Sequence, residues 1–196
     1  IGENHFNRDF RYSFIKNNTK NPIRRLIAYY RNYILGKRVQ KLDNLVCLTE
    51  DDANSWGKKV KTVVIPNPLT FSSEKKAQYG SKQIIAVGRL TLEKGFDLLL
   101  ESWKQVCHNN PTWHIKIYGE GPEERRLKDF IIDNHLFNVE IHPFVSDISS
   151  KLVESDFLVL SSRFEGFGLV IIEAMECGLP VIAFDCKSGP GEIISD

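Results

Sequence analysis

The chain has 196 residues, of which 42% are hydrophobic and 26% are charged, and these proportions are ordinary for a globular protein. No run reaches the ~18 apolar residues of a membrane span, and no secretory signal pattern opens the chain. The formal net charge of +1 identifies no class of partner. Residues 1–41 nevertheless hold ten basic and two acidic side chains. This asymmetry indicates either an anionic surface or substrate, or an ordinary solvated helix face.

The cysteines point to a reducing compartment. They are widely spaced and form no C-x-x-C pair: Cys47, Cys107, Cys177 and Cys186. We expect buried, reduced thiols and therefore a cytoplasmic location, with peripheral contact at the inner face of the cell membrane through residues 1–41. The chain opens with Ile1 rather than Met, and we interpret it as a piece of a longer protein.

The first third of the chain predicts two helices and two strands. Apolar residues at helical spacing, with arginines on another face, predict an amphipathic helix. The elements are a helix over 22–41, a strand over 44–48, a helix whose N-cap is Thr49, and a strand over 62–69 that runs into a Pro-Asn-Pro linker.

From residue 82 onward, nearly continuous apolar strands alternate with helical patterns. The strands are predicted at 83–87, 113–119, 138–142, 156–161 and 180–184, and the helices at 95–107, 122–134, 147–154 and 168–177, with another near Gly191. This alternation predicts an α/β fold, a Rossmann-like parallel sheet with helices on both faces. Such sheets bind ligands at the carboxyl ends of their strands, so the strand-to-helix loops are the places to search.

The first of these loops carries two cations, Arg89 and Lys94, followed by Gly95 at the predicted start of a helix. Helix N-termini favour anions, and two neighbouring cations repel each other unless an anion lies between them. A phosphate or diphosphate would fill that role. The alternative is a pair of solvated loop side chains.

The second loop holds Gly119 and Gly121, which allow close approach of a ligand, and Pro122, which favours a helix start. The pattern resembles part of a dinucleotide fingerprint, although Glu124 occupies the third glycine position. Glu140 follows about 20 residues later, so a dinucleotide site stays an alternative.

The third loop carries an aromatic, Phe144, next to Val145, and these could face a base or pack in the core. His142 before them is interpreted as a satisfied edge histidine. In the last loop, Asp185 and Ser188 provide polar groups at a strand end, with a plain turn as the alternative.

The fourth loop places Gly166 and Gly168 between two glutamates. Glu165 precedes a helix, where the helix dipole alone stabilises a negative charge. Glu173 lies within an apolar helix, so we predict a buried carboxylate that needs hydrogen-bond donors, such as sugar hydroxyls. A structural partner such as Arg163 is the alternative.

No metal site is predicted, because the five histidines are scattered. The acidic run over residues 50–52 lies at a helix start and is interpreted as capping.

Three segments together resemble a known family: "VGRLTLEKG", "YGEGPE" and "EGFGLVIIEAMECGLPVIA". They look like the retaining glycosyltransferases of family four, which have the GT-B fold, and Glu165 with Glu173 fits the E-x7-E motif of that family. The resemblance covers Val63 to Asp196. Members that act in bacterial polysaccharide and lipopolysaccharide synthesis, including galactosyltransferases, are the most similar.

The resemblance implies two Rossmann-like domains that face each other across a cleft. Residues 1–66 would end the N-terminal acceptor domain, and residues 67–196 would form a truncated C-terminal domain for the nucleotide sugar. The catalytic residues implied are Glu165, Arg89, Lys94 and, weakly matched, His5. The donor-binding residues implied are Gly88, Arg89, Lys94, Gly119, Glu120, Gly121, Pro122, Phe144, Val145, Glu165, Gly166, Phe167, Gly168, Leu169 and Glu173.

The implied activity is transfer of a hexose, such as galactose, from a nucleotide-diphospho-sugar to a glycan or lipid-linked hydroxyl, with retention at the anomeric carbon. The resemblance favours a UDP-sugar over a GDP-sugar as substrate, and it implies no metal, no cofactor and no nucleic acid. The isolated chain is expected to bind nucleotide and not to turn over. The alternatives are a non-catalytic binding module, a GT-B sugar-nucleotide epimerase and a dinucleotide-dependent oxidoreductase.

Overall fold

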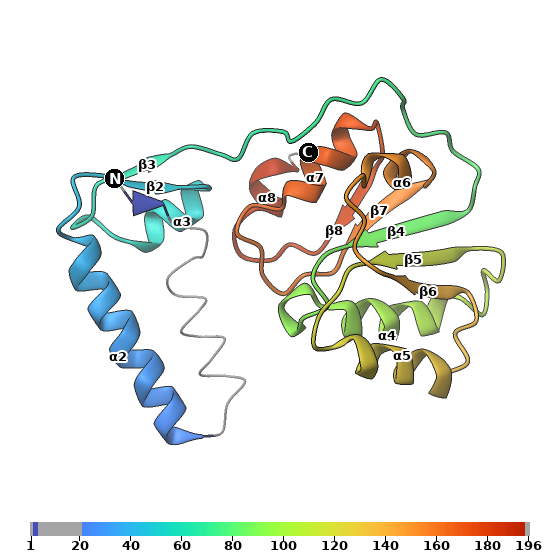
Figure 1. Ribbon diagram of the computed structural model, residues 1–196, viewed down its shortest axis with the longest axis horizontal. Coiled ribbons are helices and arrows are strands. Elements are labelled where there is room, and N and C mark those ends of the chain that lie inside the picture. Colours follow the sequence, from blue (N-terminus) through green and yellow to red (C-terminus); the bar gives the residue numbers. More distant parts are fainter. Residues whose placement is uncertain (1, 4–20, 195–196) are drawn as a thin grey trace. The chain divides into compact units, whose positions relative to one another are not determined.

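A computed structural model describes residues 2–3 and 21–194 (Figure 1). The chain divides into two compact units. The first contains Ile1–Pro68, Phe164–Phe167 and Lys187–Asp196, and the second contains Leu69–Arg163 and Gly168–Cys186. The predicted domain division after residue 66 stays a prediction, because compact packing by itself does not show where a folding domain ends.

The first unit is built on a small parallel sheet in the order β1-β2-β3. Its elements are β1 (Gly2–Glu3), α2 (Pro22–Val39), β2 (Leu45–Cys47), α3 (Glu50–Ser55), β3 (Thr62–Val64) and α8 (Pro190–Ile193). Its core gathers Cys47, Ala53 and Trp56 with apolar residues of α2 and β2. Burial, and then the neighbouring Asp52, raise the pKa of the Cys47 thiol to about 12, so this cysteine is an inert thiol as expected.

Helix α2 turns its small residues inward. The side chain of Asn21 caps its first turn by accepting from the Ile23 and Arg24 N–H groups. The buried residues of the helix are Ala28, Gly36 and Val39, so it packs in the unit through a narrow face. The apolar face predicted from sequence is exposed, with Leu26 at 69% of its full exposure.

Helix α3 is capped twice. The Thr49 hydroxyl accepts from the Asp52 N–H at 3.2 Å, which confirms the predicted N-cap. The Glu192 carboxylate accepts from the N–H groups of Glu50 and Asp51 at 2.8 and 2.9 Å. The capping groups are thus Thr49 and Glu192, and Glu50, Asp51 and Asp52 supply the N–H groups that are capped. Their own carboxylates lie in the first turn, where the helix dipole favours negative charge.

The second unit is a parallel sheet in the order β6-β5-β4-β7-β8. Its strands are β4 (Gln83–Val87), β5 (His114–Tyr118), β6 (Val139–His142), β7 (Phe157–Leu160) and β8 (Val181–Ala183). Its helices are η1 (Leu92–Lys94), α4 (Phe96–Val106), α5 (Glu124–Asp133), α6 (Ser149–Val153) and α7 (Leu169–Glu176). The α/β fold with a parallel sheet, predicted from apolar strands alternating with helices, is confirmed.

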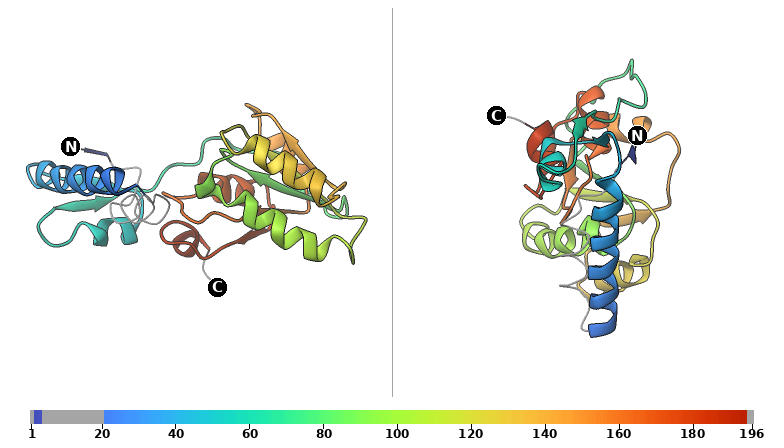
Figure 2. Two further views of the ribbon diagram at one scale, coloured as in Figure 1. Left: turned by 90° about the horizontal axis from the view of Figure 1, so that it is seen from below. Right: turned by 90° about the vertical axis from the view of Figure 1, so that its left-hand side faces the viewer.

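Helices cover both faces of this sheet, α4 and α5 on one side and α6 and α7 on the other (Figures 1 and 2). Successive residues of β4 point alternately to the two faces of the sheet. Ile84 and Ala86 belong to the core beneath α4 and α5, whereas Ile85 packs in the core with residues of α6 and α7. This alternation follows from the two-residue period of a strand.

A carboxylate ties the segment before β4 to the start of β7. Asp156 accepts from the Gly80 N–H, from the Ser81 hydroxyl at 2.7 Å and from the Gln83 N–H at 3.1 Å. Burial would raise its pKa, but these hydrogen bonds hold the pKa of Asp156 below its ordinary value. The carboxylate thereby fixes where β4 begins.

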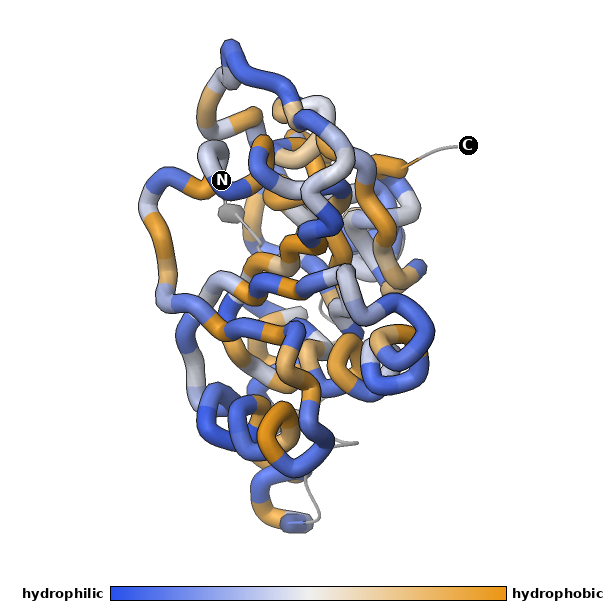
Figure 3. The backbone as a smooth tube through the Cα atoms, turned by 90° about the vertical axis from the view of Figure 1, so that its right-hand side faces the viewer, coloured by the Kyte–Doolittle hydropathy of each residue, from blue (hydrophilic) through white to orange (hydrophobic). Residues whose placement is uncertain are grey.

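Within the described residues, no helix is long and apolar enough to cross a membrane. Apolar and polar residues are interspersed along the chain (Figure 3). Most predicted bounds differ from the observed ones by one or two residues, as at the helix predicted from Pro122, which begins at Glu124. The largest difference is the strand predicted over 62–69, which ends at Val64. The 3₁₀ turn η1 and strand β1 were not predicted.

Gly95 joins η1 to α4 where the backbone lies against Ser161, the residue after β7. It adopts φ +65°, and a Cβ added there would overlap the Ser161 carbonyl oxygen. A side chain at this position would clash with the neighbouring backbone. It would also force a residue with a Cβ into the left-handed conformation. Glycine is therefore required on both grounds.

We expect Gly95→Ala to destabilise the second unit more than Gly178→Ala does. Gly178 has φ +66°, and its added Cβ would meet only the flexible Lys76 side chain, 3.6 Å away. Both substitutions cost about 1–2 kcal/mol for the left-handed backbone, and Gly95→Ala adds ~1–3 kcal/mol for displaced backbone. Urea unfolding of both variants checks the difference, and equal losses would contradict the close contact at Ser161.

Candidate functional site

The candidate site lies at the carboxyl edge of the second unit's sheet. The chain runs outward in one direction from β4 to β5 and β6, and then crosses to β7 and β8 on the other side of β4. The strand order therefore reverses between β4 and β7. Open α/β sheets bind ligands in the crevice outside such a switch point, and the loops after β4 and β7 flank it.

The loop after β4 carries the two predicted cations. Arg89 is exposed and Lys94 is half-buried. The stem of Lys94 lies beside Gly88, whose added Cβ would be 3.4–3.6 Å from the Lys94 side-chain carbons. Among the residues that the structure describes, no acceptor forms an ion pair or hydrogen bond with Arg89. A cation held at a switch point without an internal counter-charge is a ready partner for an anion.

The glycines of the second loop are required for backbone packing. A Cβ on Gly119 would overlap the Gly88 carbonyl, and one on Gly121 would overlap the Leu90 backbone. The Leu90 N–H donates to the Glu120 carbonyl at 2.8 Å. The glycines thus let the loop after β4 lie directly on the loop after β5, and their approach to a ligand stays a prediction.

The outer rim of the site is open. Phe144 is 71% exposed, and its N–H points to the Glu120 carboxylate at 3.4 Å. The alternative of core packing is therefore wrong for Phe144. Val145 beside it packs against the core under α6 and α7, while Pro122 is exposed. An exposed aromatic ring beside this edge is free to stack on a flat ligand group.

His142 is an edge histidine, as interpreted from sequence. Its ring stacks on Tyr118 with centroids 4.9 Å apart, and its Nε2 lies 2.8 Å from a Glu140 carboxylate oxygen. Glu140 lies in the body of β6, two residues before its end. The acidic residue of a dinucleotide site would be expected at the strand end, so this geometry speaks against that alternative.

Glu173 differs from its prediction. It lies in α7 as expected but is half-buried, so the prediction of a buried carboxylate is wrong. One carboxylate oxygen accepts from the Thr70 hydroxyl at 2.7 Å. Arg163, considered as its structural partner, pairs elsewhere. Gly168 takes φ +93° as the N-cap of this helix, and Leu169 is its first residue.

The buried glutamate of the motif is Glu165. It is 5% exposed and belongs to the first unit, together with Gly166 and Phe167. In that unit, Gly189 is needed beside it: its added Cβ would be 3.3 Å from the Glu165 Cβ and would overlap the Phe167 carbonyl. Ser188 precedes this glycine in the same turn and donates to Asp51 at 2.6 Å. The last loop therefore supports Glu165.

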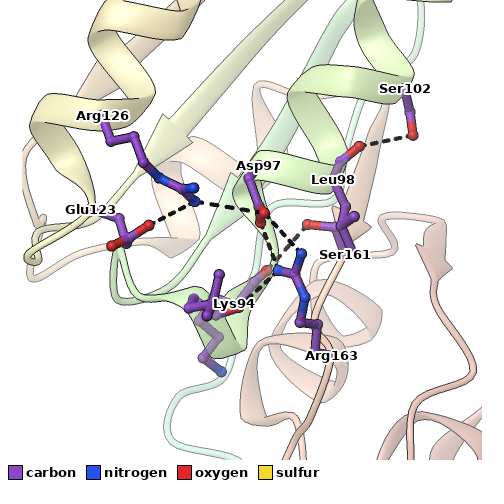
Figure 4. A network of polar contacts seen from close by, with 9 residues as sticks. Lys94, Asp97, Leu98, Ser102, Glu123, Arg126, Ser161 and Arg163 are labelled. Carbon is purple, nitrogen blue, oxygen red and sulfur yellow. Dashed lines mark hydrogen bonds and ion pairs between the residues drawn. The ribbon is translucent and has the colours of Figure 1, made fainter. Parts of the chain in front are cut away.

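A polar network behind the loop after β4 was not predicted (Figure 4). The Arg163 guanidinium donates to both carboxylate oxygens of Asp97, at 2.6 and 2.8 Å. Arg126 lies 3.6 Å from the same carboxylate and 2.7 Å from Glu123. Burial would raise the pKa of Asp97, but the Arg163 hydrogen bonds and both guanidinium charges hold that pKa below its ordinary value.

The structure thus gathers Gly88, Arg89 and Lys94 with the two loops after β5 and β6 at one sheet edge. His5 lies outside the described residues. In the described part of the chain, no three His, Cys, Asp or Glu side chains form a group that could hold a metal. An aspartate in the first turn of α4 and an arginine after β7 were visible signals, but only the sheet order pairs them.

Comparison with known proteins agrees with this architecture. Residues 70–196 match the family described as Glycosyl transferases group 1. An uncharacterized glycosyltransferase of Haemophilus influenzae is 36% identical over 188 residues, covering 93% of this chain and 51% of that protein. The amylovoran biosynthesis glycosyltransferase AmsD of Erwinia amylovora is 38% identical over 165 residues, covering 79% of this chain and 46% of that protein. The chain spans about half the length of these relatives.

Solved structures show the same fold. S. aureus TarM, in complex with UDP, superposes with a TM-score of 0.76 and 26% identity over 85% of this chain and 35% of that one. Anabaena Alr3699/HepE, in complex with UDP and glucose, superposes with a TM-score of 0.75 and 19% identity over 99% of this chain and 54% of that one. The predicted GT-B architecture is confirmed, and the chain belongs to the glycosyl transferases group 1 family.

Proposed function

We propose that the second unit binds the diphosphate of a nucleotide sugar, and that the whole protein transfers the sugar to an acceptor hydroxyl. The observation that carries this proposal is Arg89, a cation without a counter-charge among the described residues, next to Lys94 at the switch point of the sheet. Two cations at that edge match a diphosphate better than a single phosphate or a neutral sugar.

The proposed chemistry follows from these charges. A nucleoside diphosphate that leaves the anomeric carbon develops negative charge, and fixed cations lower the energy of that transition state. Arg89 and Lys94 would supply this charge with no proton transfer of their own. The Glu165 side chain would contact the donor sugar. The loop that follows it, Gly166, Phe167 and Gly168, would contact the sugar as well, because its glycines allow close approach.

The nucleoside would lie along the outer rim of the edge. Glu173 would accept hydrogen bonds from the ribose hydroxyls while Thr70 holds its other side. The exposed ring of Phe144 would stack on the base. Gly88, Gly119, Glu120, Gly121 and Pro122 would border the diphosphate and nucleoside, and Leu169 would begin the helix that faces them.

The substrate classes rest on the relatives. We propose a UDP-hexose donor, transferred with retention to a glycan or lipid-linked hydroxyl in surface polysaccharide synthesis. The TarM and HepE structures contain UDP, and AmsD is named for amylovoran biosynthesis.

Nucleotide binding by the 196-residue chain tests the proposal. We expect isothermal titration calorimetry to detect UDP binding, and Arg89→Ala and Lys94→Ala each to weaken it about 10–100-fold, the range for loss of a charge-assisted hydrogen bond. Lys104→Ala, in the last turn of α4, removes the same charge away from the edge and should leave the affinity unchanged.

The same titration separates the alternatives. Binding of NAD without binding of UDP or GDP would overturn the proposed donor site. Glu173→Gln should weaken UDP binding because a neutral amide accepts hydrogen bonds less strongly than a carboxylate. Unchanged affinity would remove Glu173 from the ribose site and leave the Thr70 contact as its whole role.

Retention has a direct test in the natural full-length protein. Incubation with UDP-hexoses and a panel of lipid-linked and glycan acceptors should give a product with the donor's anomeric configuration, read from the one-bond carbon–hydrogen coupling in NMR. An inverted product would contradict the retaining mechanism. No transfer to any acceptor, despite tight UDP binding, would favour the non-catalytic module.

We also propose that α2 contacts an anionic surface. Arg24, Arg31 and Arg38 are exposed and lie about two turns apart in succession along the helix. The large apolar side chains Leu26 and Tyr30 are exposed beside them. Basic and aromatic groups that share one helix are typical of contact with an anionic membrane surface.

Vesicle sedimentation tests the surface contact. The chain should sediment with phosphatidylglycerol-containing vesicles and not with neutral phosphatidylcholine vesicles, and the bound fraction should fall with salt. Changing the three arginines to alanine should abolish sedimentation. The matched control changes Lys58, Lys59 and Lys61, also exposed in the first unit, to alanine; an equal loss there would contradict a specific role for α2.

A further inference from the structure

The connection between β4 and α4 is anchored from β7 by Arg163. The Arg163 N–H donates to the Glu93 carbonyl at 2.8 Å. Its guanidinium donates to the Leu92 carbonyl at 2.9 Å and forms the two bonds to Asp97, in the first turn of α4. One residue after β7 therefore fixes the turn that ends at Lys94.

The backbone of Lys94 is held from the same strand end. The Ser161 hydroxyl donates to the Lys94 carbonyl at 3.2 Å. Gly95, the next residue, lies directly against the Ser161 carbonyl. Because the main chain on both sides of Lys94 is tied to β7, the origin of its side chain is fixed in space.

A second anchor holds the loop on the side of Arg89. The Glu123 N–H donates to the Leu90 carbonyl at 3.0 Å, and the Leu90 N–H donates to the Glu120 carbonyl at 2.8 Å. Arg126 bridges the Glu123 carboxylate to Asp97 (Figure 4). Each candidate cation is therefore the sequence neighbour of an anchored residue: Arg89 precedes Leu90, and Lys94 follows Glu93.

Arg163 is already paired with an internal anion. Its charge is compensated by Asp97, and its Nη1 and Nη2 atoms both donate to that carboxylate. The Arg163 and Asp97 side chains are 30% and 26% exposed, and ion pairs at such exposure contribute little to stability. A bidentate guanidinium pair nevertheless fixes geometry closely.

We propose that Arg163 and Asp97 are positioning residues for diphosphate binding: the pair holds the Leu92–Glu93 turn so that Lys94 faces the anion beside Arg89. This inference rests on the proposed nucleotide site. It assigns a role to the arginine in "SRFEGFG" that neither the E-x7-E glutamates nor the two cations supply. Loss of the guanidinium fork would leave Lys94 present but displaced.

A double-mutant cycle with UDP titration tests the proposal in the 196-residue chain. Arg163→Lys keeps the charge and loses the fork, so we expect UDP affinity to fall roughly fivefold or more, within the range of couplings between residues that share a network. In the Lys94→Ala background the same substitution should change affinity much less, because Arg163 acts through Lys94. An equal fold-change in both backgrounds would overturn the positioning role.

Two control variants accompany the cycle. Arg125→Lys alters an arginine whose side chain is 95% exposed and lies 4.0 Å from Asp129, and should leave affinity unchanged. If Arg163→Lys does not fold, judged by urea unfolding, Asp97→Asn takes its place in the cycle with the same expectation. Asp97→Asn affinity equal to that of the unchanged chain would then overturn the proposal.

The proposed function and the positioning role fail separately. Absence of UDP and GDP binding in the unchanged chain overturns both. UDP binding that Lys94→Ala weakens and Arg163→Lys leaves intact overturns only the positioning role, and the nucleotide site stands.

Discussion

The second unit depends on direct contact between strand-end backbones. The loop after β4 lies on the loop after β5 at Gly119 and Gly121, and on the end of β7 at Gly95, with no side chain between them. Such contact is possible only at glycine, which has no Cβ. It brings three loops of a parallel sheet to one compact edge, and the two candidate diphosphate-binding cations of this unit stand on that edge.

Charge is arranged on this frame in two layers. Behind the loop, Arg163, Arg126, Asp97 and Glu123 neutralise one another. At the edge, Arg89 has no counter-charge among the residues described. This separation of paired from unpaired charges has a consequence for binding. An anion that reaches the edge meets a cation whose charge is not compensated, and the turn beside that cation is held in place by a network whose charges are compensated.

Much of the fold was predictable because it depends on local rules. Apolar strands between helices indicated the parallel sheet, and Thr49 indicated the start of α3. The errors arose where tertiary contacts decide burial. Glu173 was predicted to be buried from its apolar neighbours, yet Thr70 reaches it from the preceding segment on a half-exposed face. For Phe144 the sequence left a base-facing ring and core packing open, and only the structure shows that the ring is exposed.

The sequence by itself determined the class of fold and the family, because glycines, cations and strand periodicity leave local signatures. It also indicated the residues that we propose contact a nucleotide sugar. Only the tertiary structure decided which of these residues share an edge and what holds them. Asp97 and Arg163 are 66 positions apart and meet only because β4 and β7 are neighbours in the sheet. Strand order is a property of the whole packed sheet, and no short segment encodes it.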